Sequence, residues 1–88
     1  MKLKYKFEIV EVGDDITAVP VGDGADAMHG VLQLNDAGAD IMRLLENDTT
    51  EPAIVGAIYE MYDVEKQELT GQVHDFIETL KKDGIITE

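Results

Sequence analysis

The sequence predicts one α+β domain of winged helix-turn-helix type, with a three-stranded antiparallel sheet at the N-terminus followed by three helices. Two observations support this prediction. Apolar and polar residues alternate with period two in the first third of the chain, and in the rest apolar residues recur at helical spacing behind residues that cap helices. The 88 residues contain no repeat and no linker long enough to divide them, so we expect a single domain over residues 1–88.

The period-two segments are bounded by glycine and acidic turn residues. They predict three strands, over residues 5–12, 16–21 and 28–34. The segment 22–26, which is rich in glycine and aspartate, is expected to form a loop between the second and third strands. Because side chains alternate along a strand, Leu32 and Leu34 are expected to face the core, and Val31 and Gln33 to face the other way.

Helix starts and ends are marked by characteristic residues. Asn35 and Thr50 are good N-caps, and Gly84 suits the left-handed position after a last turn. These signals predict helices over residues 36–46, 51–62 and 65–82. The last of them carries an apolar stripe at helical spacing, formed by Leu69, Val73, Phe76, Ile77 and Leu80. Ile85 and Ile86 are expected to fold back onto the domain as an apolar tail.

Charge restricts the partners of the chain. It has 19 acidic and 7 basic residues, for a formal net charge of −12. Binding nucleic acid requires Lys and Arg to neutralise phosphates, so we expect no nucleic-acid partner, and a winged-helix transcription regulator is the less favoured alternative. No segment approaches the ~20 apolar residues that span a bilayer, and no signal-peptide pattern follows the basic N-terminus. We therefore expect a cytoplasmic protein without a membrane partner.

The composition also argues against catalysis. The chain has no cysteine and no serine, which removes thiol and serine nucleophiles. Its two histidines, His29 and His74, are far apart in the sequence and belong to no recognised ligand motif, and no phosphate-binding glycine motif occurs. We expect no enzyme activity, no cofactor and no metal site.

The sheet offers the remaining route to a function. A short sheet leaves edges whose unpaired N–H and C=O groups can accept another strand, and the third predicted strand adjoins the helical half of the domain. A peptide could dock along residues 31–34, against the helix over 65–82. The residues alone leave an alternative open, in which the same apolar side chains only complete the core, as amphipathic stripes more often do.

The stretch from Gly30 to Leu45, GVLQLNDAGADIMRLL, resembles the strand-to-helix signature of the PqqD family. In that signature a leucine-asparagine pair precedes a glycine or alanine and then an isoleucine. Residues 51–62 are similar to the family's second helix, and residues 73–86 to its closing pattern of phenylalanine, leucine, glycine and two aliphatic residues. The resemblance covers nearly the whole chain, and its motifs specify the fold better than the partner.

The resemblance implies a non-catalytic recognition element for ribosomally synthesised and modified peptides, in the biosynthesis of pyrroloquinoline quinone (PQQ) or in another such pathway. Such proteins bind the leader region of a precursor peptide as an extra strand beside their third strand and against their third helix. They present it to a modifying enzyme, often a radical SAM protein. The peptide-binding residues implied here are Val31, Leu32, Gln33, Leu34, Leu69, Gln72, Val73 and Phe76. A non-catalytic adaptor module is a further alternative, and homodimerisation through a sheet edge stays open.

Overall fold

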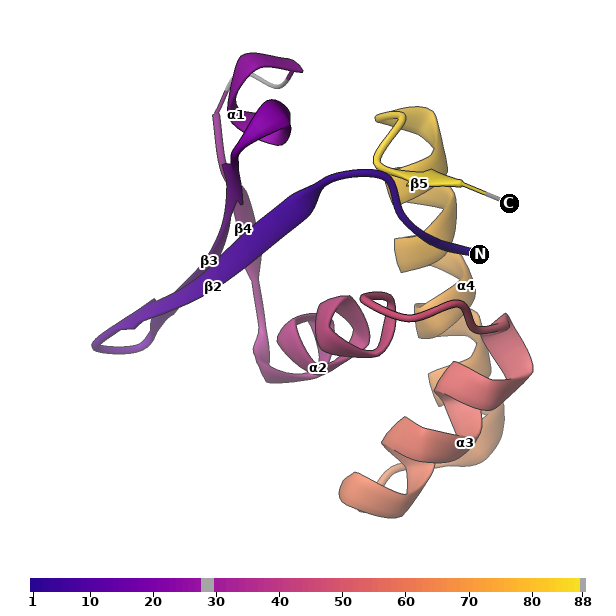
Figure 1. The fold of residues 1–88 in the computed structure, drawn as a ribbon. Coiled ribbons are helices and arrows are strands. Elements are labelled where there is room, and N and C mark those ends of the chain that lie inside the picture. The colour runs from indigo at the N-terminus through magenta and orange to yellow at the C-terminus, as the bar shows by residue number, and fades with distance from the viewer. Residues whose placement is uncertain (28–29, 88) are drawn as a thin grey trace.

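The computed structural model describes residues 1–27 and 30–87, and Figure 1 shows the three-stranded sheet, with a short helix beside it, on one side of the molecule and the three long helices on the other. The elements are, in chain order, β1 (Lys2–Leu3), β2 (Lys6–Val12), β3 (Asp15–Val21), α1 (Asp23–Ala27), β4 (Leu32–Leu34), α2 (Asp36–Leu44), α3 (Glu51–Met61), α4 (Lys66–Lys82) and β5 (Ile86–Thr87). The α+β class and the predicted order of a three-stranded antiparallel sheet followed by helices are confirmed. None of the described helices is long and apolar enough to cross a membrane.

The main sheet has the order β2-β3-β4, with both pairings antiparallel. A two-residue turn at Gly13 and Asp14 joins β2 to β3, and Gly13 has a φ of 62°, which the first position of such a turn favours. The side chains of Phe7, Ile16 and Ala18 are buried. Because β3 is the central strand, β2 and β4 are the two edges of the sheet.

The side chains of β4 point as the alternation predicted. Leu32 and Leu34 are half-buried and pack against the core, whereas Gln33 is exposed. Val31, immediately before the strand, is 56% exposed. The strand therefore presents one apolar face to the domain and leaves its other face in solvent.

β4 is shorter than the predicted strand over 28–34. Residues 28 and 29 lie outside the described part of the chain, and Gly30 has a φ of 100°, which is not an extended conformation. The register that pairs Ala18 with Leu32 would place Gly30 opposite Pro20 if the ladder continued. Proline has no N–H to donate, so β3 cannot extend the ladder beyond Leu32.

The predicted loop over 22–26 is wrong, because residues 23–27 form the short helix α1. Gly22 turns the chain with a φ of 61°, and α1 then packs against the sheet through Gly24. A Cβ at Gly24 would lie 2.9 Å from Cβ of Tyr5, so only glycine permits this approach. The glycine that made this segment look like a loop is needed instead for the close contact between α1 and Tyr5.

A second small sheet pairs the two ends of the chain, and the sequence did not predict it. Antiparallel pairing joins Lys2 to Thr87 and Leu3 to Ile86. Ile85 and Ile86 are buried, which confirms that this segment folds back as an apolar tail. In addition, the backbone N–H of Lys4 donates to the carbonyl of Ile85 at 2.7 Å. A separate N-terminal strand, β1, therefore precedes the strand predicted over 5–12. It pairs with β5 and so holds the segment that follows α4 against the N-terminus.

Helices α2 and α3 begin where the sequence predicted and end two residues and one residue earlier. Helix α4 begins one residue later than predicted, because Glu65 is its N-cap, and ends at Lys82 as predicted. Asn35 Oδ1 accepts from the N–H of Gly38 at 2.7 Å, and Thr50 Oγ1 accepts from the N–H of Ala53 at 3.3 Å. Gly84, with a φ of 70°, follows the end of α4 in the left-handed conformation. These caps fix the entry of the chain into α2 and α3.

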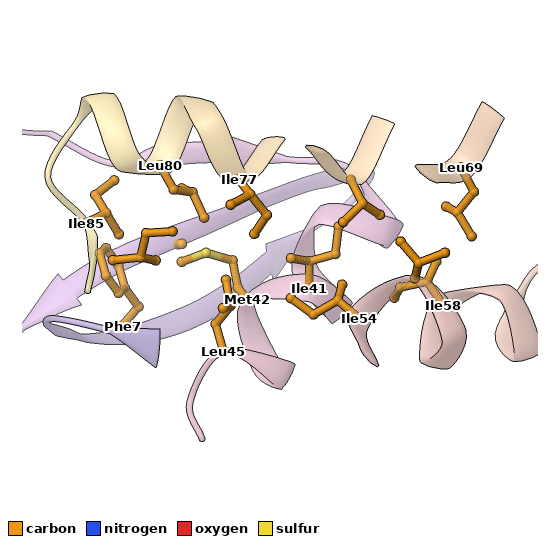
Figure 2. Packing of buried hydrophobic residues seen from close by; sticks show 14 residues of the cluster. Phe7, Ile41, Met42, Leu45, Ile54, Ile58, Leu69, Ile77, Leu80 and Ile85 are labelled. Carbon is orange, nitrogen blue, oxygen red and sulfur yellow. The ribbon is translucent and has the colours of Figure 1, made fainter. Parts of the chain in front are cut away.

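The core lies between the three long helices and the inner face of the sheet, as Figure 2 shows. The stripe of α4 is buried at four of its five predicted positions, and the fifth, Phe76, is only partly covered. The buried residues contributed by α2, α3 and α4 are Ile41, Met42, Ile54, Val55, Ile58, Leu69, Val73, Ile77 and Leu80. The incomplete burial of Phe76 directs attention to the surface next to it.

Candidate functional site

A groove of about 230 Å³ opens where the chain passes from β4 into α2. Its walls are the first turns of α2 and the first half of α4. The lining residues are Asn35, Ala37, Gly38, Ile41, Leu69, Gln72, Val73 and Phe76. All four helix positions implied by the resemblance are among them, whereas residues 31–34 lie beside the groove and outside its lining.

The lining residues from α4 divide into a floor and a rim. Leu69 and Val73 are only 4% and 0% exposed, so they belong to the core and form the floor. Gln72 is exposed and Phe76 is half-buried, and these two side chains form the accessible rim. The four residues occupy positions i, i+3, i+4 and i+7, which places them on one side of the helix. The two interpretations of this helix face therefore hold for different residues: Leu69 and Val73 complete the core, and Gln72 and Phe76 are accessible at the groove.

The opposite wall depends on Gly38. This buried glycine lies in the first turn of α2, and a Cβ there would lie 3.1 Å from Oδ1 of Asn35 and 3.5 Å from Cδ2 of Leu34. The absence of a side chain therefore keeps the helix cap intact and leaves space beside Leu34. From the sequence, Asn35 was predicted only as a helix cap, and Ala37, Gly38 and Ile41 only fell within the helix predicted over 36–46. The glycine within the capped first turn was the one signal that could have marked them as groove residues.

The free edge of β4 presents the backbone of Gln33. Val12 and Asp15 close the two-residue turn of the hairpin as a hydrogen-bonded pair, and hydrogen-bonded and non-hydrogen-bonded pairs alternate along antiparallel strands. Thr17 therefore directs its N–H and C=O toward β2 and not toward β4. Gln33, which pairs with Thr17, must direct its own N–H and C=O away from the sheet. No other described strand pairs with that edge, so these two groups can accept a further strand.

None of the described residues that line the groove is charged. An apolar or uncharged side chain would enter it without desolvating an ion, while its backbone could pair with β4. The site is therefore an open strand edge with a side-chain pocket at its end.

Comparison with known proteins identifies the family of the chain. Residues 23–86 match the family model described as coenzyme PQQ synthesis protein D (PqqD). The chain belongs to the PqqD family. The match begins at α1 and extends through β4 and the three long helices to β5, so it includes every lining residue of the groove.

Two solved structures are similar to this PqqD-family chain over almost its entire length. TbiB1 in complex with the TbiA(β) leader peptide has a TM-score of 0.69 and 22% sequence identity, and the match covers 97% of this chain and 93% of that one. Lasso peptide synthetase B1 complexed with the leader peptide has a TM-score of 0.68 and 17% identity, covering 99% and 96%. These likenesses confirm the fold. No curated protein matches the chain.

One polar contact holds the wall of the groove that α2 forms. Tyr62, at the end of α3, donates its hydroxyl hydrogen to Oδ2 of Asp40 in α2 at 2.5 Å, and Arg43 Nη1 lies 3.2 Å from the other carboxylate oxygen. The hydrogen bond to this carboxylate raises the pKa of Tyr62 to about 12 from its ordinary value of 10.0. The hydrogen bond therefore joins α2 to the end of α3 at every pH at which the phenol of Tyr62 stays protonated.

Replacing Tyr62 by phenylalanine is expected to lower the free energy of unfolding by about 1 kcal/mol, since it removes a partly exposed hydrogen bond to a charged group. A group whose pKa is raised on folding stabilises the fold below its unfolded pKa, and this stabilisation is lost as the pH rises through the folded value. Urea unfolding should therefore show the difference at neutral pH and its decline between pH 10.0 and about 12. Tyr59→Phe, on the exposed side of the same helix, should leave stability unchanged.

A second polar cluster lies away from the groove. Nδ1 of His74 lies 3.2 Å from Oε2 of Glu51, and Nε2 lies 4.0 Å from Oε1 of Glu78. The hydrogen bond with Glu51 raises the pKa of His74 above its ordinary value of 6.5, with the charges of Glu51 and Glu78 adding to it. The expectation of no metal site rested on spacing along the chain, and this cluster spans two helices.

Proposed function

We propose that this chain binds the leader region of a ribosomally synthesised precursor peptide as an added strand on β4, and presents the peptide to a modifying enzyme. The observation that carries the proposal is the continuity between the free edge of β4 and the groove at its end. Membership of the PqqD family supports it, as do the two similar structures that each hold a leader peptide. In this role the chain acts as a binding protein in the cytoplasm and needs no catalytic centre.

The geometry suggests how affinity and selectivity are divided. The N–H and C=O of Gln33, and those of Val31 if the alternation continues, pair with the backbone of the peptide. This pairing tolerates many sequences because it involves no side chain of the peptide. A peptide side chain that projects toward α4 meets Gln72 and Phe76 and enters the uncharged groove. Selection among peptides would therefore come from the residue placed there.

The modifying enzyme is proposed from the family alone, and a radical SAM enzyme is the class that we favour. DNA binding is not favoured, since the exposed residues of α4 include Glu68 and Asp75 where a recognition helix would approach phosphates. A homodimer that pairs through a free sheet edge would use either β4 or β2. Pairing through β4 would compete directly with the leader peptide, whereas pairing through β2 would leave β4 open.

An NMR titration tests the proposal. The labelled full chain is titrated with a synthetic copy of the N-terminal half of the short peptide encoded nearest to its gene, and with a scrambled copy as control. We expect amide shifts confined to residues 31–38 and 69–76 with the native sequence only. Shifts located on the β2 edge, or equal shifts with the scrambled copy, would contradict binding at β4. The absence of shifts up to about 100 μM, an affinity scale well within reach of strand addition, would do the same.

A further inference from the structure

Three ligand-type side chains from two helices meet on the surface of the helical half. Glu51 is the first residue of α3, and His74 and Glu78 lie one turn apart on α4. One donor atom from each residue can be chosen so that all three lie within 4.8 Å of one another. Within the described part of the chain, this is the one group of three or more histidine and acidic side chains that has such a geometry.

The donor set suits a borderline transition-metal ion. An imidazole with two carboxylates is a nitrogen and oxygen set of the kind that Zn²⁺ accepts, whereas Mg²⁺ and Ca²⁺ prefer oxygen ligands alone. Metal–ligand distances of about 2.0–2.2 Å place tetrahedral ligand atoms about 3.4 Å apart. The 3.2 Å between Nδ1 of His74 and Oε2 of Glu51 is close to that value. Glu78 lies 4.0 Å from the other ring nitrogen, Nε2, and one donor atom of each of the three residues still falls within 4.8 Å of the others. All three side chains are partly or largely exposed, so rotation of the imidazole or of a glutamate is free to bring both carboxylates to one ring nitrogen.

We propose that Glu51, His74 and Glu78 form a binding site for Zn²⁺ that links the start of α3 to the middle of α4, with water completing the coordination. At 3.6 residues per turn, His74 and Glu78 lie on the other side of the buried stripe of α4 from Gln72 and Phe76. The site is therefore separate from the groove, and its test does not depend on the proposed peptide-binding function.

The site also has a competing occupant, which is a proton. The charged groups around the ring are Glu51 from α3 and Asp75 and Glu78 from α4, and Lys81 Nζ lies 3.6 Å from Oε1 of Glu78. Zn²⁺ must displace the proton from the imidazole and draw Glu78 from Lys81. Binding should therefore weaken at least about tenfold between pH 7.5 and pH 5.5, as expected for a histidine ligand.

The experiment is a titration of the full chain with ZnCl₂, followed by calorimetry and by the ring ¹H–¹⁵N signals of both histidines. We expect shifts at the His74 ring and at the amides of residues 51 and 74–78. His74→Ala should weaken Zn²⁺ binding at least about tenfold and Glu78→Gln several-fold, since each removes one ligand. His29→Ala removes the other imidazole and should bind like the parent chain. Asp75→Asn removes one nearby negative charge without removing a ligand, so it should weaken Zn²⁺ binding less than Glu78→Gln does.

Diffuse attraction of cations to a chain of net charge −12 is the main alternative. A parallel titration with CaCl₂ reports that effect. Zn²⁺ binding that survives in both His74→Ala and Glu78→Gln, or shifts spread over the acidic surface as with Ca²⁺, would overturn the site, and so would no binding at all. If circular dichroism shows that His74→Ala is misfolded, Glu51→Gln and Glu78→Gln decide the question.

Discussion

Replacing Gln33 by proline is expected to weaken leader-peptide binding at least about tenfold while leaving the domain folded. The N–H of Gln33 points to the free edge of β4, so proline removes a donor that a peptide strand would use and none that β3 uses. A hydrogen bond contributes about 0.5–1.5 kcal/mol net, and the pyrrolidine ring also obstructs the approaching strand, so the two effects together exceed the ~1.4 kcal/mol that corresponds to tenfold. Isothermal titration calorimetry with the leader peptide measures the loss.

Gln33→Ala is the matched control, because it removes the exposed side chain and keeps the backbone donor. Its affinity should lie within about threefold of the parent chain, which is the range of an exposed substitution. Circular dichroism should show that both variants retain the fold. Equal affinities for Gln33→Pro and the parent chain would mean that the peptide does not pair with β4. A loss of the same size in Gln33→Ala would mean that the side chain of Gln33, rather than its backbone, provides the contact.

Replacing Ile77 by alanine is expected to lower the free energy of unfolding by about 2–5 kcal/mol, the range for removing a buried aliphatic side chain from a core. Ile77 is 0% exposed and lies among Leu80, Met42 and Ile41 in the centre of the core (Figure 2). A domain of 88 residues has a total stability of roughly 4–13 kcal/mol. One such cavity therefore removes a large share of it.

Urea unfolding of the two proteins provides the measurement, with the midpoint compared at an unchanged slope. Val64→Ala is the control, since Val64 is 45% exposed in the link between α3 and α4 and should change stability by no more than about 0.5 kcal/mol. A loss below about 1 kcal/mol in Ile77→Ala would show that the three helices are packed less closely than described here.

The predictable parts of the fold are those encoded by local chemistry. The starts of α2 and α3 follow from caps at Asn35 and Thr50, and the end of α4 follows from Gly84. The inward side of β4 follows from the alternation of Leu32, Gln33 and Leu34. Each of these signals acts within a few residues, so the sequence alone contains it.

The unpredicted parts depend on contacts between distant segments. The pairing of β1 with β5 joins residues at opposite ends of the chain, and α1 exists because Gly24 fits against Tyr5. The ladder of β4 ends early because Pro20, on another strand, lacks a donor. None of these partners is adjacent in the sequence, so the patterns of single segments cannot reveal them.

The candidate site was partly predictable for the same reason. The resemblance to the PqqD family implied Leu69, Gln72, Val73 and Phe76, and the structure brings all four into one groove. It missed the wall from α2, because the residues there, such as Gly38, already had a local explanation as the capped start of a helix. The cluster of Glu51, His74 and Glu78 was missed because it joins two helices.

Amide hydrogen exchange at β4 tests the central proposal of strand addition most directly. In the free chain the N–H groups of Leu32 and Leu34 face β3 and should be protected, whereas that of Gln33 faces solvent and should exchange fast. With saturating leader peptide we expect exchange at Gln33 to slow at least about tenfold, while Leu32 and Leu34 change little. Unchanged fast exchange at Gln33 in the saturated complex would show that the peptide does not add a strand to β4.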